Sequence, residues 1–142
     1  MAQKRYFEDV EVGDEIGPVI ENCSEVQLFF FSAATNNGHR IHYDLPYAKT
    51  EGHPTILVHG PLQTALMAKT VLDWAGPGAR LVRIQLQNRG SAYPHEDLYF
   101  GGVVTDKRQE SGRALVDCDL YERKADGTVI MPGTATVSLP RR

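Results

Sequence analysis

Residues 36–48, NNGHRIHYDLPYA, concentrate hydrogen-bonding and titratable side chains in one short segment. Histidine is the side chain that changes charge near neutral pH without help from its surroundings, so His39 and His42 are candidate proton-transfer groups. Four of the five histidines lie within one connection between two predicted helices: His39, His42, His53 and His59. Such clustering favours a catalytic or binding site. His95 lies apart from the cluster and is expected at the surface.

A metal site is a weaker interpretation of the same segment. His39, His42 and Asp44 could act as ligands, but the sequence has neither a cysteine pair nor a His-Glu-x-x-His arrangement typical of zinc. Asp44 is instead expected to cap the turn that follows it. We therefore expect no metal.

A predicted helix before the segment begins with Ser24, and Gln27 follows at the spacing of a capping box. Gly38 is predicted to end it in a left-handed conformation. Helical spacing predicts a buried face made of Val26, Phe29, Phe30, Ala33 and Asn37. Asn37 would then lie at the end of that face, where it serves either as a helix cap or as a site residue.

A second predicted helix follows the segment, over residues 62–74, with Pro61 at its first position and Gly76 and Pro77 at its end. This helix is apolar on most sides, which indicates that other structure encloses most of it.

The rest of the chain predicts strands. Residues up to about Ile20 form an irregular strand, and the second half of the chain alternates apolar and polar positions. The inward-facing positions are Val82, Ile84, Leu86, Ala114, Val116, Cys118 and Leu120; the outward-facing ones are Arg83, Gln85, Gln87, Asp117, Asp119 and Tyr121. Gly101 and Gly102 inside a strand indicate a bulge or a close backbone approach. The predicted fold class is α+β: a curved antiparallel sheet around one long helix, with an extra helix and a loop before it.

Composition limits the remaining interpretations. The chain has 142 residues, 42% of them hydrophobic, and a formal net charge of -3, which fits one domain over residues 1–142 and argues against a nucleic-acid partner. It has no apolar run of membrane-spanning length, so we expect no membrane association. It has no apolar centre near its start, so we expect no export signal and a cytoplasmic location. Cys23 and Cys118 are expected to be reduced, with Cys118 in the core.

Three stretches resemble the MaoC-like hydratases and dehydratases of the hot-dog fold: YFEDVEVGDEI, NGHRIHYDLPYA and LVHGPLQTALM. HRIHYD and VHGPLQ are closest to the branch with 3-hydroxyacyl-thioester dehydratases and mesaconyl-CoA-type hydratases. The resemblance places the family histidine on His42. It also places Asn37, His39 and Arg40 where the family has aspartate, asparagine and proline.

The resemblance implies a hydro-lyase that reversibly hydrates 2-enoyl thioesters of CoA or acyl carrier protein, without a cofactor beyond the thioester itself. It also implies a homodimer or larger assembly. His42 would act as base and acid, and Asn37 would orient water through its carbonyl or its amide. Gly60 and Leu62, at the start of the second helix, would present N–H groups to the enolate oxygen.

Three further residues are expected to bind substrate: His39, Arg40 and His59. Arg40 could pair with a second carboxylate, as in mesaconyl-CoA, or with a CoA phosphate, or be a surface charge. Two alternatives remain open for the chain: a hot-dog thioesterase, and a thioester-binding protein that has lost activity because asparagine replaces aspartate.

Overall fold

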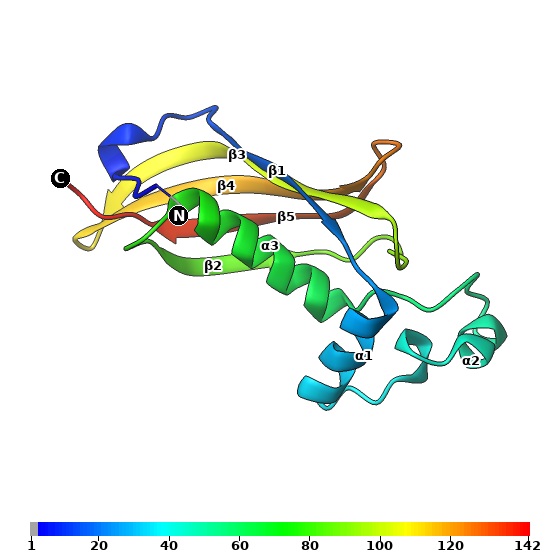
Figure 1. Ribbon diagram of the computed structural model, residues 1–142. Coiled ribbons are helices and arrows are strands. Elements are labelled where there is room, and N and C mark those ends of the chain that lie inside the picture. The colour runs from blue at the N-terminus through cyan, green and yellow to red at the C-terminus, as the bar shows by residue number, and fades with distance from the viewer. Residues whose placement is uncertain (1–2) are drawn as a thin grey trace.

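The computed structural model describes residues 3–142 and contains one antiparallel sheet in the order β1-β3-β4-β5-β2. The strands are β1 (Glu15–Asn22), β2 (Arg80–Leu86), β3 (Asp97–Glu110), β4 (Arg113–Lys124) and β5 (Val129–Ser138). The sheet curves around the long helix α3 (Gly60–Ala75), as Figure 1 shows. This arrangement confirms the predicted fold class.

Strand β4 shows why the sheet could be predicted from its sequence. Its alternating apolar residues are all buried: Ala114, Val116, Cys118 and Leu120. Burial also raises the pKa of Cys118 to about 12, which fits an unreactive core thiol. The close approach predicted at the paired glycines is present, since a Cβ on Gly102 would lie only 2.3 Å from the backbone oxygen of Asp119.

One inward position differs from the prediction. Val82 is 44% exposed, because the pairing of β2 with β5 shifts register between Leu81 and Arg83. The shift turns Leu81 toward the core, where it packs with Ile84 and Leu86. In α3, the residues facing the sheet are buried, whereas a stripe with Ala65, Lys69 and Asp73 remains exposed. Other structure therefore encloses most of this helix, as predicted, and one stripe faces solvent.

A second region lies beyond the sheet, next to the start of α3 (Figure 1). It contains α1 (Glu25–Ala34), the short 3-10 helix η2 (Arg40–His42) and α2 (Leu45–Thr50). A separate 3-10 helix, η1 (Phe7–Asp9), precedes β1. The side chain of Ser24 caps α1 by accepting a hydrogen bond from the Gln27 N–H, as predicted. The C-terminus and the first described residues of the chain lie at the opposite end of the sheet.

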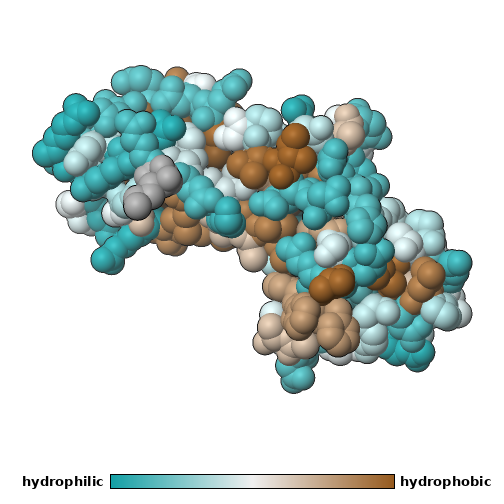
Figure 2. All heavy atoms as spheres, viewed as in Figure 1, coloured by the Kyte–Doolittle hydropathy of each residue, from teal (hydrophilic) through white to brown (hydrophobic). Residues whose placement is uncertain are grey.

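The predicted buried face of α1 is wrong. Leu28 and Ser32 are its buried residues, whereas Val26, Phe29 and Phe30 are 64%, 58% and 64% exposed. Apolar side chains gather over α1 in Figure 2. Three successive phenylalanines, at 29–31, spread apolar area around the whole helix, so periodicity alone could not select the packed side.

The end of α1 also differs from the prediction. The helix ends at Ala34, and Asn36 rather than Gly38 takes the left-handed conformation, with φ of 52°. Asn37 therefore lies in the following loop, where its N–H donates to the Ser32 carbonyl at 2.9 Å. Over residues 3–142, no helix combines the length and hydropathy that crossing a membrane requires.

Candidate active site

His42 is the best-positioned general base in the structure. It lies at the end of η2 with a side chain only 7% exposed, and its Nδ1 is 2.8 Å from the carbonyl oxygen of Leu57. Because a carbonyl oxygen only accepts, Nδ1 must carry the proton, and the lone pair of the neutral ring is on Nε2. Leu57 is fixed in turn, since its N–H donates to the Ile41 carbonyl at 3.0 Å.

His59 packs directly against His42. The two rings are stacked with centroids 3.8 Å apart and planes 19° apart. The Nε2 atom of His59 is hydrogen-bonded to the hydroxyl of Ser32 at 2.7 Å, and the ring of Phe31 lies edge-on at 4.8 Å. These contacts bring α1, η2 and the residue before α3 together around two imidazoles.

The surroundings keep both imidazoles neutral. Burial lowers the pKa of His59 to about 4, and the neighbouring His42 adds to this effect. Burial also lowers the pKa of His42; the bond to Leu57 opposes this shift, and His39 adds to it. At neutral pH, His42 can therefore accept a proton, and the resulting charge does not face a second charged imidazole at His59.

Asn37 is half-buried in the loop between α1 and η2. Its Oδ1 accepts a hydrogen bond from the His39 N–H at 3.2 Å, a local turn contact. The second lone pair of Oδ1 and the amide N–H groups therefore remain to bind water or substrate. The exposed His39 ring stands edge-on to His42 at 5.8 Å, so it can reach the same site from the solvent side.

The start of α3 lies next to His59 in the chain. The Gln63 N–H donates to the His59 carbonyl at 3.0 Å, which is the first bond of the helical ladder. Pro61 has no N–H, so Gly60 and Leu62 carry the N–H groups of the first turn that precede this ladder. The Gln63 side chain donates to the carbonyls of Val58 and His59 and holds this chain segment against the helix.

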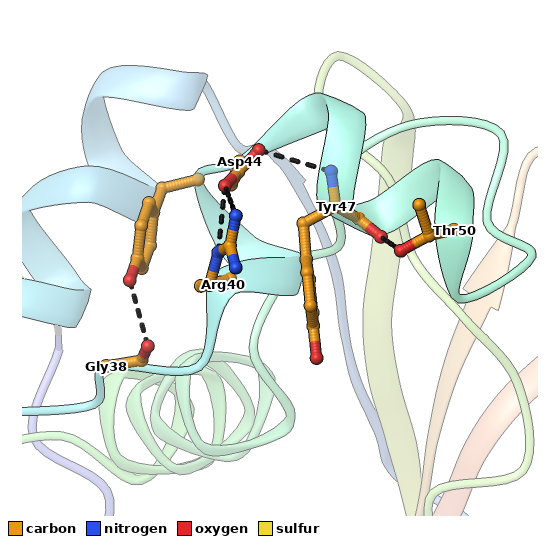
Figure 3. A network of polar contacts seen from close by, with 6 residues as sticks. Gly38, Arg40, Asp44, Tyr47 and Thr50 are labelled. Atoms are coloured by element: carbon orange, nitrogen blue, oxygen red, sulfur yellow. Dashed lines mark hydrogen bonds and ion pairs between the residues drawn. The ribbon is translucent and has the colours of Figure 1, made fainter.

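Arg40 belongs to a polar network with Asp44 and Tyr47 (Figure 3). Its Nε and Nη2 donate to Asp44 at 2.9 and 2.6 Å, and its guanidinium lies 4.4 Å from the centroid of the Tyr47 ring. Asp44 also caps α2 by accepting from the Tyr47 N–H at 3.2 Å, as predicted. Both charged partners are thus occupied within the loop.

The remaining histidines, His53 and His95, lie outside the group of contacts around His42 and His59. His95 is exposed and bonds to Glu25 at 2.7 Å, which confirms its expected surface position. His53 has no contact with the imidazole pair among the described residues. Within residues 3–142, no group of three His, Cys, Asp or Glu side chains has the arrangement of a metal site.

A cavity of about 220 Å³ opens beside the site. Its walls come from α1 and the loop that follows: Phe29, Ser32, Ala33, Asn36, Asn37, Gly38 and Tyr43. Ser32 belongs both to this wall and to the hydrogen bond with His59. A molecule in the cavity would therefore contact Ser32, the hydrogen-bond partner of His59.

Ser32 was missed by the sequence reasoning. The signal was present, because Leu28 and Ser32 are four positions apart and share one helical face. The more apolar face, with Phe29 and Phe30, was predicted to be buried instead.

Comparison with known proteins identifies the family. The model of the hydroxyacyl-thioester dehydratase type 2 family matches residues 14–93, more than half of the chain. The chain belongs to this family. The match includes α1, the histidine loop, α3 and β2, so it covers every residue of the site described above.

Two curated proteins are similar in sequence to this chain, and both are named as hydratases. The β subunit of 3-oxo-4,17-pregnadiene-20-carboxyl-CoA hydratase from Mycobacterium tuberculosis is 33% identical over 109 residues, covering 77% of this chain and 79% of that protein. Mesaconyl-C(4)-CoA hydratase from Chloroflexus aurantiacus is 61% identical over 41 residues, which cover 28% of this chain and 15% of that protein.

The fold assignment agrees with solved structures. The MaoC-like dehydratase from Rhodospirillum rubrum superposes with a TM-score of 0.84 at 19% identity, covering 97% of this chain and 98% of that one. This likeness confirms the hot-dog fold expected from the sequence resemblance.

Proposed function

We propose that this dehydratase-family protein reversibly adds water to the double bond of 2-enoyl thioesters of CoA or acyl carrier protein. The observation that carries the proposal is the tautomer of His42: the bond from Nδ1 to Leu57 leaves a basic Nε2 on a ring that is stacked against His59. The family match and the two relatives named as acyl-CoA hydratases support the same reaction.

In the proposed reaction, His42 Nε2 takes a proton from water while the water oxygen attacks C3 of the enoyl group. The electrons of the C2–C3 double bond move toward the thioester carbonyl and form an enolate. The imidazolium then returns its proton to C2, which completes the addition and restores neutral His42. The Leu57 carbonyl stabilises the transient imidazolium through its bond from Nδ1.

Other residues position the reactants. Asn37 orients the attacking water through its amide N–H, while its oxygen accepts from the His39 N–H. The N–H groups of Gly60 and Leu62 hold the enolate oxygen at the start of α3, where the helix dipole favours negative charge. His59 supports the His42 ring by stacking, and His39 lies edge-on to the same ring, so these two histidines are the remaining substrate-binding candidates; Arg40, which is bonded to Asp44, is not one of them. Proton transfer and hydrogen bonding suffice for this chemistry, so no cofactor is required.

A thioesterase is the weaker alternative. That reaction needs a base for water attack at the carbonyl, and a carboxylate on the central helix would serve. Asp73 is the only carboxylate of α3; it lies near the helix end remote from His59 and pairs with Lys69 at 2.6 Å. This placement favours the hydratase.

The proposed assembly is a dimer of hot-dog subunits. Strands β1 and β2 form the two edges of the sheet, and Val82 on β2 is exposed. An open edge can pair with the same edge of a second copy. Sedimentation equilibrium tests this part of the proposal: a dimer mass agrees with it, and a monomer mass at micromolar concentration contradicts it.

The decisive experiment for the activity follows the loss of enoyl-thioester absorbance with crotonyl-CoA. His42→Ala should lower turnover by a factor of about 10² or more, because a positioned general base contributes that much. His95→Ala is the matched control, since this exposed histidine lies outside the site, and it should keep wild-type turnover. Absence of hydration by the wild-type protein, together with tight CoA-ester binding, would favour a non-catalytic binding protein instead.

A further inference from the structure

We propose that the cavity between α1 and the histidine loop receives an uncharged acyl chain, and that Phe29, Ala33 and Tyr43 determine the chain length accepted. This inference rests on the proposed hydratase function and names the substrate class for it. Its evidence is the position, chemistry and size of the cavity.

The position of the cavity suits the acyl end of a thioester. Ser32 lines it and is hydrogen-bonded to His59, whose ring is stacked on His42. Asn37 lines it from the opposite end of the same α1–loop junction. A chain that begins at the reacting carbons and extends away from His42 would enter this space along α1.

The walls of the cavity favour an apolar, uncharged group. None of its lining residues is charged, and its wall, which includes Phe29, Ala33 and Tyr43, is mainly apolar. The Tyr43 hydroxyl donates to the Gly38 carbonyl at 2.9 Å, so the tyrosine offers its ring rather than its hydroxyl to a ligand. This bond also holds the loop in the shape that closes one side of the cavity.

A second carboxylate on the acyl group would have no free cation to meet there. Arg40 is the nearest candidate in the loop, but both of its bonds go to Asp44, and it does not line the cavity. Burying an unpaired carboxylate against Phe29 and Ala33 would be unfavourable. The cavity therefore selects against dicarboxylic acyl groups such as mesaconyl.

The size of the cavity sets a range of chain lengths. An apolar cavity of about 150 Å³ holds benzene, so a cavity of this size fits an acyl group of roughly six to eight carbons. The exposed side of Phe29 forms its rim, which gives a reason for an aromatic side chain that is more than half exposed.

The test compares kcat/KM for trans-2-enoyl-CoA substrates of four, six, eight and ten carbons. Ala33→Phe places a ring in the cavity and should lower the eight-carbon to four-carbon ratio by about tenfold or more. Phe29→Ala should raise the ten-carbon to four-carbon ratio. Phe30→Ala is the matched control, because this adjacent phenylalanine does not line the cavity, and its ratios should equal those of the wild type. Mesaconyl-CoA should be hydrated at least tenfold less efficiently than crotonyl-CoA.

An active Ala33→Phe variant with an unchanged chain-length ratio would overturn the acyl site while leaving the hydratase proposal intact. A preference for mesaconyl-CoA would overturn the uncharged substrate class. If the wild type hydrates none of these substrates, the hydratase proposal fails, and calorimetric binding of saturated acyl-CoAs decides the cavity separately. Affinity that rises with chain length and is lost in Ala33→Phe supports the acyl site; affinity independent of chain length overturns it.

Discussion

The sheet with α3 and the segment from α1 to the start of α3 are stabilised in different ways. In the sheet, continuous strand pairing surrounds fully buried residues such as Phe100, Val116 and Met67. In the segment, α1 exposes two of its phenylalanines, and much of the order comes from single polar contacts, such as those made by Asp44 and Tyr43. The segment nevertheless supplies most of the candidate catalytic and binding side chains.

This contrast separates stability from activity. Core residues of the sheet should determine the free energy of unfolding, because large buried apolar areas stabilise the folded state. Residues of the segment should determine turnover and selectivity while contributing less to stability. Substitutions in the sheet are therefore expected to change mainly stability, and substitutions in the segment mainly turnover and selectivity.

The largest expected effect on stability belongs to Phe100 at the centre of the sheet. It is fully buried between β1 and β4, so Phe100→Ala should lower the free energy of unfolding by about 3–5 kcal/mol. Phe30→Ala on the exposed side of α1 should change it by less than about 0.5 kcal/mol. Urea denaturation measures both variants. Equal losses would remove the distinction between the two regions.

Each region also contains a buried titratable group, and the two groups have opposite effects on stability. Burial raises the pKa of Glu122 in β4 to about 7 from 4.5, with Lys124 opposing the shift, so its stabilisation is present below pH 4.5 and is lost as pH rises through 7. The pKa of His59 falls to about 4 from 6.5, so its stabilisation is present above pH 6.5 and is lost as pH falls through 4. Each shift corresponds to about 3 kcal/mol.

Between about pH 4.5 and 6.5, the loss of stability with rising pH that Glu122 causes offsets the gain that His59 causes in the wild type. Glu122→Gln should remove the contribution of Glu122, so that the free energy of unfolding rises with pH across this window because of His59 alone. The variant should also be more stable than the wild type at pH 8. Urea denaturation at several pH values measures this, with the exposed Glu15→Gln as control. A Glu122→Gln curve parallel to the wild-type curve would contradict the prediction.

A smaller effect is expected at Asn37. Asn37→Asp keeps an oxygen for the His39 N–H but removes the amide donor, so crotonyl-CoA turnover should fall about tenfold. The added negative charge should also raise the pKa of His42 and move the acid limb of activity to higher pH. Increased turnover in the variant would instead indicate that asparagine impairs the native site.

The smallest effect is expected for Arg40→Ala. Arg40 makes its polar contacts within the loop and lies outside the acyl cavity, so kcat/KM for crotonyl-CoA should stay within about threefold of the wild type. Asp44→Asn serves as a control that weakens the same pair from the other side. A large rise in KM for CoA substrates in Arg40→Ala alone would assign this arginine to a CoA phosphate.

The two regions also differed in how well the sequence predicted them. The alternation in β4 led directly to its buried face, because a period of two leaves no other choice. Val82 was placed wrongly because a bulge shifts the register of β2, and a bulge leaves no mark in the alternation. The buried side of α1 was placed wrongly because aromatic residues surround that helix.

The sequence likewise predicted some residues of the site but not the contacts between them. The clustering of histidines led to His42 and His59, and the helix start signal led to Gly60. The sequence could not show that the two imidazoles stack, that Ser32 bonds to one of them, or that Arg40 bonds to Asp44. These facts depend on how α1 and the loop fold over the start of α3, which the spacing of residues does not specify.

The pH dependence of kcat/KM for crotonyl-CoA, measured for wild type and His42→Ala, most directly tests the role of His42. The neutral ring is the active form, so wild-type activity should fall as pH drops through a pKa below 6.5 and level off above it. On the plateau, His42→Ala should retain about 1% of wild-type activity or less. A variant with near wild-type activity and the same acid limb would contradict the assignment of His42 as the base.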